Sequence, residues 1–259
     1  MGFFDKSYYK EGPGVGKNER KKTALFRFFD IFFGHFWQLM ALNALYFGMC
    51  LPVVTIGAST AGFTYCVKNI IAGKPIFVIH DFFKGFKNNW KQGTAMMLIN
   101  AVFGFLMFVA FSFYVFSPEV ITSQGLRIAF AILLGVICIV YSMMQFYTYL
   151  LMVTFDLRFG AVLKNSFLMI VIGIKQNFIA MFFTLVYVFL IIWALFPFSI
   201  ILCMLFLLSL MGATVVFIVY PVVKKIMIDP YEEENKEIPE QIFTDATDRP
   251  EELPSEKKK

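Results

Sequence analysis

The chain has 259 residues, of which 59% are hydrophobic and only 16% are charged. Soluble globular proteins are about 45–50% apolar and about 25% charged, so this composition excludes an ordinary water-soluble fold and indicates a membrane protein. A mean hydropathy of +0.70 and 34 phenylalanines favour the same class.

The net charge of +5 is unevenly distributed. Residues 1–228 carry 18 basic and 7 acidic side chains, whereas residues 229–259 carry 5 and 11, so a body of +11 precedes a tail of −6. A basic body suits an anionic lipid surface. Nucleic acid is not an expected partner, because the Lys and Arg residues punctuate apolar runs and never form a dense tract.

Three regions follow from this composition. Residues 1–23 form a polar, basic N-terminus, and residues 24–225 form the membrane domain. Residues 226–259 form an acidic tail that we expect to be disordered, because it has too few apolar residues to offset the entropy of ordering.

Four apolar runs are long enough to cross a bilayer, which takes about 20 residues. They are Phe28–Leu51, Thr94–Phe116, Ile128–Phe155, and Phe178–Phe217 with its continuation to Val223. The last run is too long for one helix and has Pro197 at its middle. Because proline interrupts a helix, we expect two helices there, and five crossings in all.

Val53–Ile71 is the doubtful sixth crossing, because Gly, Ser and Thr residues interrupt it. Small residues are typical of closely packed membrane helices, and Pro52 would end the preceding helix. Clusters of Lys and Arg mark the cytoplasmic side, and they occur at 17–27, 74–91, 158–175 and 224–225. All four can lie on one side only if the number of crossings is even. The sequence therefore predicts an all-α bundle of about six transmembrane helices in the cell membrane, with both termini cytoplasmic and five crossings as the alternative.

An amphipathic pattern predicts a further helix over Phe77–Lys91, lying in the membrane interface. Its apolar residues recur at helical spacing, which places them on one face. The residues that could contact the interface or a partner protein are Asp81, Lys84, Lys87, Asn88, Trp90 and Lys91. Leu157–Lys175 is a weaker counterpart.

No residue pattern for catalysis or metal binding is evident. His35 and His80 have no Cys, Asp or His at ligand spacing, and the four cysteines lie in apolar runs, where Cys acts as a small hydrophobe. We therefore expect no cofactor and no enzymatic activity. The uncharged polar residues at depth are Asn43, Asn100 and Gln145. They either form hydrogen bonds between helices or line a path for a neutral solute.

Several motifs resemble the YesL-type family. They are Met1–Phe4, Gly12–Val15, Phe36-Trp37, Leu42-Asn43, Leu51–Thr60, Asp81–Gly93 and Leu163–Ser166. This family comprises multi-pass membrane proteins of Gram-positive bacteria without an assigned function, commonly encoded beside carbohydrate ABC importers. The resemblance implies an accessory role in sugar import, with permease subunits as partners, and it assigns no catalytic residues. Because the chain lacks the loop by which a permease grips its ATPase, it is not expected to be a complete permease. A transporter or channel that carries a neutral solute alone is the alternative.

Overall fold

The computed structural model describes residues 23–116, 123–194 and 198–230. These ranges are almost wholly helical and contain no strand, so the expected all-α fold is confirmed. Most of the polar N-terminus (1–22) and most of the acidic tail (231–259) lie outside the described residues.

The first apolar run forms two helices instead of one. Helix α2 (Ala24–Gly34) ends at His35, and α3 (Phe36–Cys50) begins directly after it. His35 leaves the helical backbone region, at φ −116° and ψ 19°, and its ring Nδ1 lies 3.0 Å from the carbonyl oxygen of Ile31. The predicted single helix over Phe28–Leu51 is therefore wrong. Helix α3 has 15 residues, which at 1.5 Å per residue is about 22 Å, less than the thickness of about 30 Å of a bilayer core.

The doubtful segment Val53–Ile71 forms a short 3-10 turn, η1 (Val53–Thr55), and helix α4 (Ile56–Ile71). Helix α4 lies at the centre of the molecule and contacts α3, α5, α6, α7 and α11. Eleven of its 16 residues are buried in the protein, so its polar and small residues face neighbouring helices. It is not among the helices that are long enough to span a membrane alone.

Four helices in the described part are long and apolar enough to cross a membrane. They are α6 (Trp90–Phe116), α7 (Gln124–Met152), α9 (Ile174–Phe189) with its π-helical extension η2 (Leu190–Ala194), and α11 (Leu208–Val223) with η3 (Cys203–Leu207) and η4 (Lys224–Ile228) at its ends. Phenylalanines on these helices are exposed, among them Phe108 at 71% and Phe182 at 62%. The protein is thus a multi-pass membrane protein. The six crossings would also require the shorter helices and remain a prediction.

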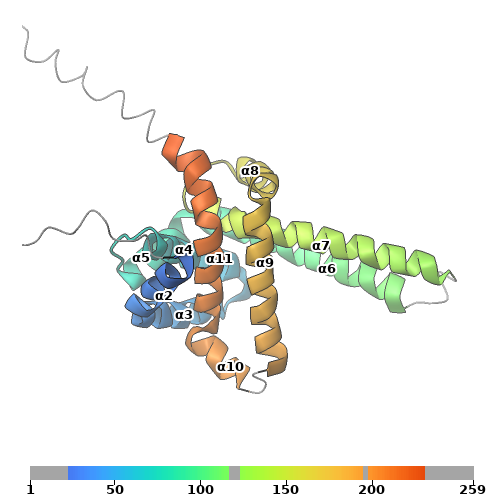
Figure 1. The fold of residues 1–259 in the computed structure, drawn as a ribbon, viewed down its shortest axis with the longest axis horizontal. Helices are drawn as coiled ribbons and strands as arrows, with labels where there is room; N and C mark the ends of the chain where they lie inside the picture. The colour runs from blue at the N-terminus through green and yellow to red at the C-terminus, as the bar shows by residue number, and fades with distance from the viewer. Residues whose placement is uncertain (1–22, 117–122, 195–197, 231–259) are drawn as a thin grey trace, which may run out of the picture.

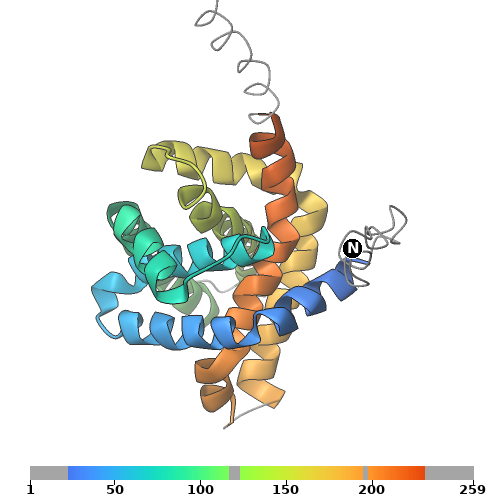
Figure 2. The same ribbon diagram turned by 90° about the vertical axis from the view of Figure 1, so that its left-hand side faces the viewer.

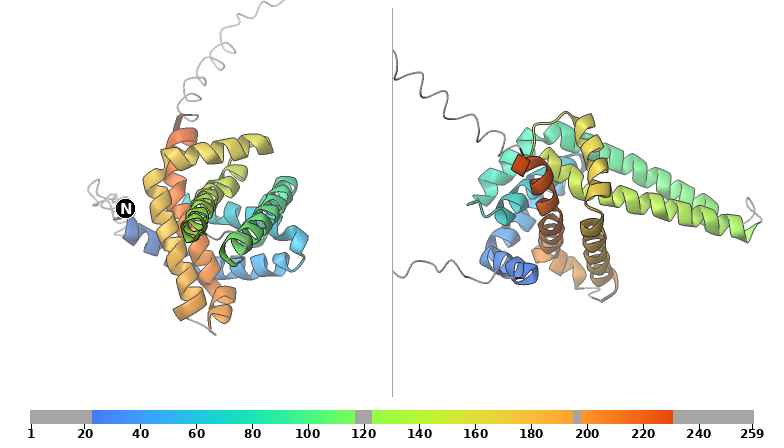
Figure 3. Two further views of the ribbon diagram at one scale, coloured as in Figure 1. Left: turned by 90° about the vertical axis from the view of Figure 1, so that its right-hand side faces the viewer. Right: turned by 45° about the horizontal axis from the view of Figure 1, so that its top comes forward.

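The spanning helices form two hairpins that diverge. Helices α6 and α7 run side by side and project away from the body, whereas α9 and α11 run side by side in another direction (Figure 1). Figure 3 shows the first hairpin from its end and the second from its side. The short helix α10 (Ser199–Leu202) precedes η3 at the far end of the second hairpin.

Two shorter helices lie away from the far ends of the hairpins. Helix α5 (Val78–Asn88) is the amphipathic helix that the sequence predicted over Phe77–Lys91. Helix α8 (Phe159–Ile172) corresponds to the weaker counterpart predicted over Leu157–Lys175. The helix ends before Gly173, however, and Lys175 belongs to α9. Both helices carry basic residues. Helix α8 and η4 lie at the top of Figure 2, whereas α5 lies lower, against α4.

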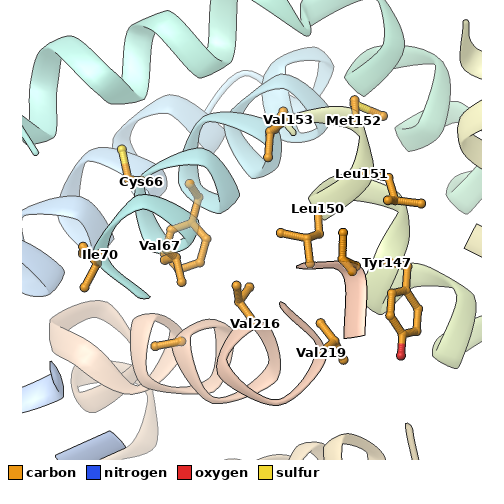
Figure 4. Packing of buried hydrophobic residues seen from close by; sticks show 14 of the residues in the cluster. Cys66, Val67, Ile70, Tyr147, Leu150, Leu151, Met152, Val153, Val216 and Val219 are labelled. Carbon is orange, nitrogen blue, oxygen red and sulfur yellow. The ribbon is translucent and has the colours of Figure 1, made fainter. Parts of the chain in front are cut away.

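The core joins α4 to the end of α7 and to α11. Its side chains include Cys66, Val67 and Ile70 of α4, Leu150 and Leu151 of α7, and Val216 and Val219 of α11 (Figure 4). The core therefore lies where the two hairpins meet, and it fixes both of them to α4.

Candidate functional site

Helix α5 is held against α4 by a close approach of two backbones. A Cβ atom on Gly85 would lie 3.1 Å from Cα of Gly62 and 2.7 Å from Cβ of Tyr65. Phe82 points into the same contact and is fully buried. Such closeness is available only to residues without side chains, and it explains why small residues recur in α4.

Asp81 has a structural role at the start of α5. Its Oδ2 accepts a hydrogen bond of 2.9 Å from the backbone N–H of Phe77, and its Oδ1 lies 3.2 Å from Nδ1 of His80. A carboxylate at this position satisfies a free backbone donor at a helix N-terminus and favours the helix dipole. The side chain of Asp81, one of the six predicted interface residues, is thus engaged within the protein.

The other five predicted interface residues are exposed. They are Lys84, Lys87, Asn88, Trp90 and Lys91, and we call them the α5 surface. Lys84, Lys87 and Asn88 follow the spacing of one face of α5, whereas Trp90 and Lys91 belong to the first turn of α6, after the break at Asn89. Lys84 also lies over the ring of Tyr65, with Nζ 5.9 Å from the ring centroid.

Two long-range hydrogen bonds join the neighbourhood of α5 to the chain between α7 and α8. Nζ of Lys68 donates to the carbonyl of Val153 at 3.0 Å, and Nε2 of Gln92 donates to the carbonyl of Leu157 at 2.9 Å. Lys68 also lies over Tyr65, 4.9 Å from the ring centroid. The sequence does not indicate this hydrogen bond of Lys68, because its partner is 85 positions away.

Two of the three polar residues expected at depth lie together. Asn100 of α6 accepts hydrogen bonds at Oδ1 from the hydroxyl of Tyr141 and from Nε2 of Gln145, the latter at 2.9 Å. Asn43 lies on α3 and is fully buried. Asn100 and Gln145 thus make the interhelical hydrogen bond that one of the two interpretations predicts.

A half-open cavity of about 230 Å³ lies where α3, α4, α7, α9 and α11 meet. Gln145 is among its lining residues, together with Tyr46, Thr60, Thr64, Tyr149 and Thr184. Nothing in the sequence indicates this cavity, because single Thr residues in apolar helices are common packing residues.

No metal centre is evident in the part of the chain that the structure describes, where no three His, Cys, Asp or Glu residues gather closely enough to hold an ion. His35 contacts its own helix and His80 contacts Asp81.

Comparison with known proteins gives one match. A family model described as "Protein of unknown function, DUF624" matches residues 39–111, which run from α3 to α6 and include α4 and α5. YesL-type proteins are grouped in this family, so the resemblance is confirmed over that segment. No curated protein matches the chain, and no solved structure does.

Proposed function

We propose that this chain, which carries the family region of the YesL-type proteins over residues 39–111, is a non-catalytic accessory subunit of a carbohydrate ABC import system in the cell membrane. Its partners would be the permease subunits, and its docking site would be the α5 surface on the cytoplasmic side. The observation that carries this proposal is that α5, which packs closely against α4, has exposed lysine side chains.

The α5 surface is preorganised for binding. Gly62 and Gly85 bring α5 into backbone contact with α4, and Asp81 caps the start of the helix. A surface that is already ordered loses less conformational entropy when it binds. Its lysines are exposed, so they favour a partner with acidic side chains by complementarity.

The distribution of charge along the four spans supports a non-catalytic role. The basic residues of the four spans all lie within five residues of the end of a span; they are Lys91, Arg127, Lys175 and Lys224–Lys225. None of the four spans contains Asp or Glu. Membrane enzymes and ion-coupled pumps place ionisable groups deep in the bilayer. The middle of these helices offers only uncharged polar groups.

Affinity purification from native membranes in a mild detergent tests the proposal. We expect permease subunits to co-purify with the wild-type chain and to be lost from the triple variant K84Q/K87Q/K91Q. The matched control is K164Q/K175Q, which removes exposed lysines from α8 and α9 and should retain the permease. Wild-type protein that brings down no permease subunit would refute the proposal, as would equal recovery with the triple variant.

The runner-up is a transporter that acts alone, and the observation in its favour is that Gln145 lines the cavity. Uptake of a neutral sugar into liposomes that contain only this protein would support it. Transport that needs the permease subunits as well would favour the accessory role.

A further inference from the structure

The cavity at the junction of the two hairpins is mainly apolar and carries no charge. Among its lining residues, all within the described part of the chain, are no Asp, Glu, Lys, Arg or His. Its apolar lining residues are Phe63, Phe146, Leu208, Met211, Val215 and Val216. A charged group would lose its hydration there without gaining a partner, so the cavity suits a neutral ligand.

The three lining threonines have already donated their hydroxyl protons within their own helices. Thr60 donates to the carbonyl of Ile56, Thr64 to that of Thr60, and Thr184 to that of Ala180, each at 2.8 Å. A hydroxyl has one proton and two lone pairs, so each threonine oxygen can still accept a hydrogen bond. These side chains therefore favour a ligand that donates.

Tyr46 and Gln145 extend the same pattern. The hydroxyl of Tyr46 lies 3.3 Å from Oγ1 of Thr60, and because the proton of Thr60 is engaged with Ile56, Tyr46 is the donor of this pair. Gln145 uses one of its two Nε2 protons in the bond to Asn100, and its Oε1, which has no hydrogen-bond partner among the described residues, is buried. A phosphate or carboxylate head group needs several donors, of which this lining offers few, whereas an alcohol can donate to the threonine oxygens.

Several lining residues of the cavity belong to helices that are long and apolar enough to span the membrane. Thr184 is near the middle of the span Ile174–Trp193, and Gln145 and Met211 lie within two other spans. The outward side chains of these spans are apolar, among them Leu185 at 60% exposure. A ligand that reaches the cavity laterally therefore comes from the lipid phase.

We propose that this cavity binds a neutral lipid whose head group carries a free hydroxyl, of the diacylglycerol type. A volume of about 230 Å³ exceeds the cavity of about 150 Å³ that holds benzene in an engineered protein, but is smaller than the sites of about 300–1,000 Å³ that enclose drug-sized ligands. It holds the glycerol head and the first carbons of the chains, and the remaining acyl chain stays in the bilayer. Soluble compounds such as glycerol also carry hydroxyl groups that can donate, but they lack the apolar chain that the cavity's apolar lining favours.

The test uses the full chain in phosphatidylcholine nanodiscs with a photoreactive diacylglycerol whose diazirine lies close to the glycerol. We expect cross-links on the lining segments of α4, α9 and α11, and competition by unlabelled diacylglycerol. Triacylglycerol, which has no free hydroxyl, and phosphatidic acid, which is anionic, should not compete. Equal competition by either lipid would overturn the hydroxyl assignment, and competition by glycerol or methyl glucoside would assign the cavity to a soluble solute instead.

Variants distinguish the cavity from the lipid-facing surface. T64V/T184V keeps the side-chain shapes and removes two acceptors, so labelling should need about tenfold more lipid. T154V is the matched control, because the Thr154 hydroxyl, just after the end of α7, also donates to a carbonyl four residues earlier, at 2.6 Å from Leu150 O, and Thr154 is not among the lining residues. V215F fills the cavity and should abolish the labelling whether or not the double variant folds. Wild-type labelling of V215F would overturn the proposal. Because this test involves no permease, its result is independent of the accessory role.

Discussion

Gly173 lies directly against the hydroxyl group of Tyr147, and a Cβ atom at position 173 would clash with that oxygen. Tyr147 comes from α7 and is fully buried, whereas Gly173 is the residue between α8 and α9. Asn177, also fully buried, donates from Nδ2 to the carbonyl of Ile170 at 2.9 Å and so bridges the same break. The contact between Gly173 and Tyr147 therefore fixes the position of the start of α9 relative to α7, and with it the direction of the second hairpin.

Gly173→Ala should lower the free energy of unfolding by about 1–3 kcal/mol, because the added methyl group overpacks a buried contact. In the double variant Gly173→Ala/Tyr147→Phe the oxygen is gone, and the nearest ring atom, Cζ, lies at an ordinary 3.4 Å. We therefore expect the second substitution to recover part of the loss, with a coupling of about 1 kcal/mol in a double-mutant cycle. Thermal unfolding in detergent measures all four proteins. Additive effects of the two substitutions would show that the contact is not the cause.

The crossing of α4 and α6 gives a second prediction. Gly57 of α4 and Gly93 of α6 are in backbone contact, and a Cβ on Gly93 would lie 2.7 Å from Gly57 O. Backbone atoms cannot turn away as a side chain can, so Gly93→Ala should destabilise by about 1–3 kcal/mol. Gly104→Ala, in the same helix, is the matched control because its added methyl group would meet nothing within 4 Å. It should be neutral or stabilise by up to about 1 kcal/mol through helix propensity. Equal effects of the two substitutions in detergent unfolding would contradict the close crossing.

The features that could be predicted from the sequence are those set by local pattern. Helix α5 was predicted within three residues at each end, because its amphipathic spacing is contained in its own sequence. The spanning helices α6, α7, α9 and α11 were evident from the length of their apolar runs. The all-α class needed no knowledge of the contacts between helices.

The features that could not be predicted depend on contacts between distant residues. The break at His35 falls inside a continuous apolar run, where hydropathy carries no signal for it. Burial of α4 depends on contacts with five other helices, so hydropathy alone left its role undecided. The cavity was missed for the same reason, since Thr64 and Thr184 are 120 positions apart and become neighbours only when α4 and α9 pack around α11.

The pairing of Asn100 with Gln145 gives a third prediction. If their hydrogen bond stabilises the α6–α7 hairpin, the Asn100→Ala/Gln145→Ala cycle should show a coupling of about 0.6 kcal/mol, the typical value for such bonds in a membrane protein. Ser142→Ala serves as the control, because the Ser142 hydroxyl donates only within α7, to the carbonyl of Cys138 at 2.8 Å. It should show no coupling to Asn100→Ala. A cycle without coupling in unfolding, together with loss of solute transport in either single variant, would support the solute path instead.

The last prediction separates the cap of α5 from the charge of the α5 surface. Asp81→Ala removes the acceptor for the backbone N–H of Phe77 and should destabilise the start of the helix by about 1 kcal/mol. Asp81→Asn keeps a side-chain oxygen at the same place, so it should retain most of this stability while it removes the negative charge. Amide hydrogen exchange over residues 77–84 is the measurement, because a lost cap speeds exchange in the first turn and leaves the rest of the protein unchanged. If Asp81→Asn exchanges as fast as Asp81→Ala, the carboxylate charge acts on the helix dipole and the hydrogen bond is secondary. If neither variant changes the exchange, the contact with Gly62 holds the helix without the cap.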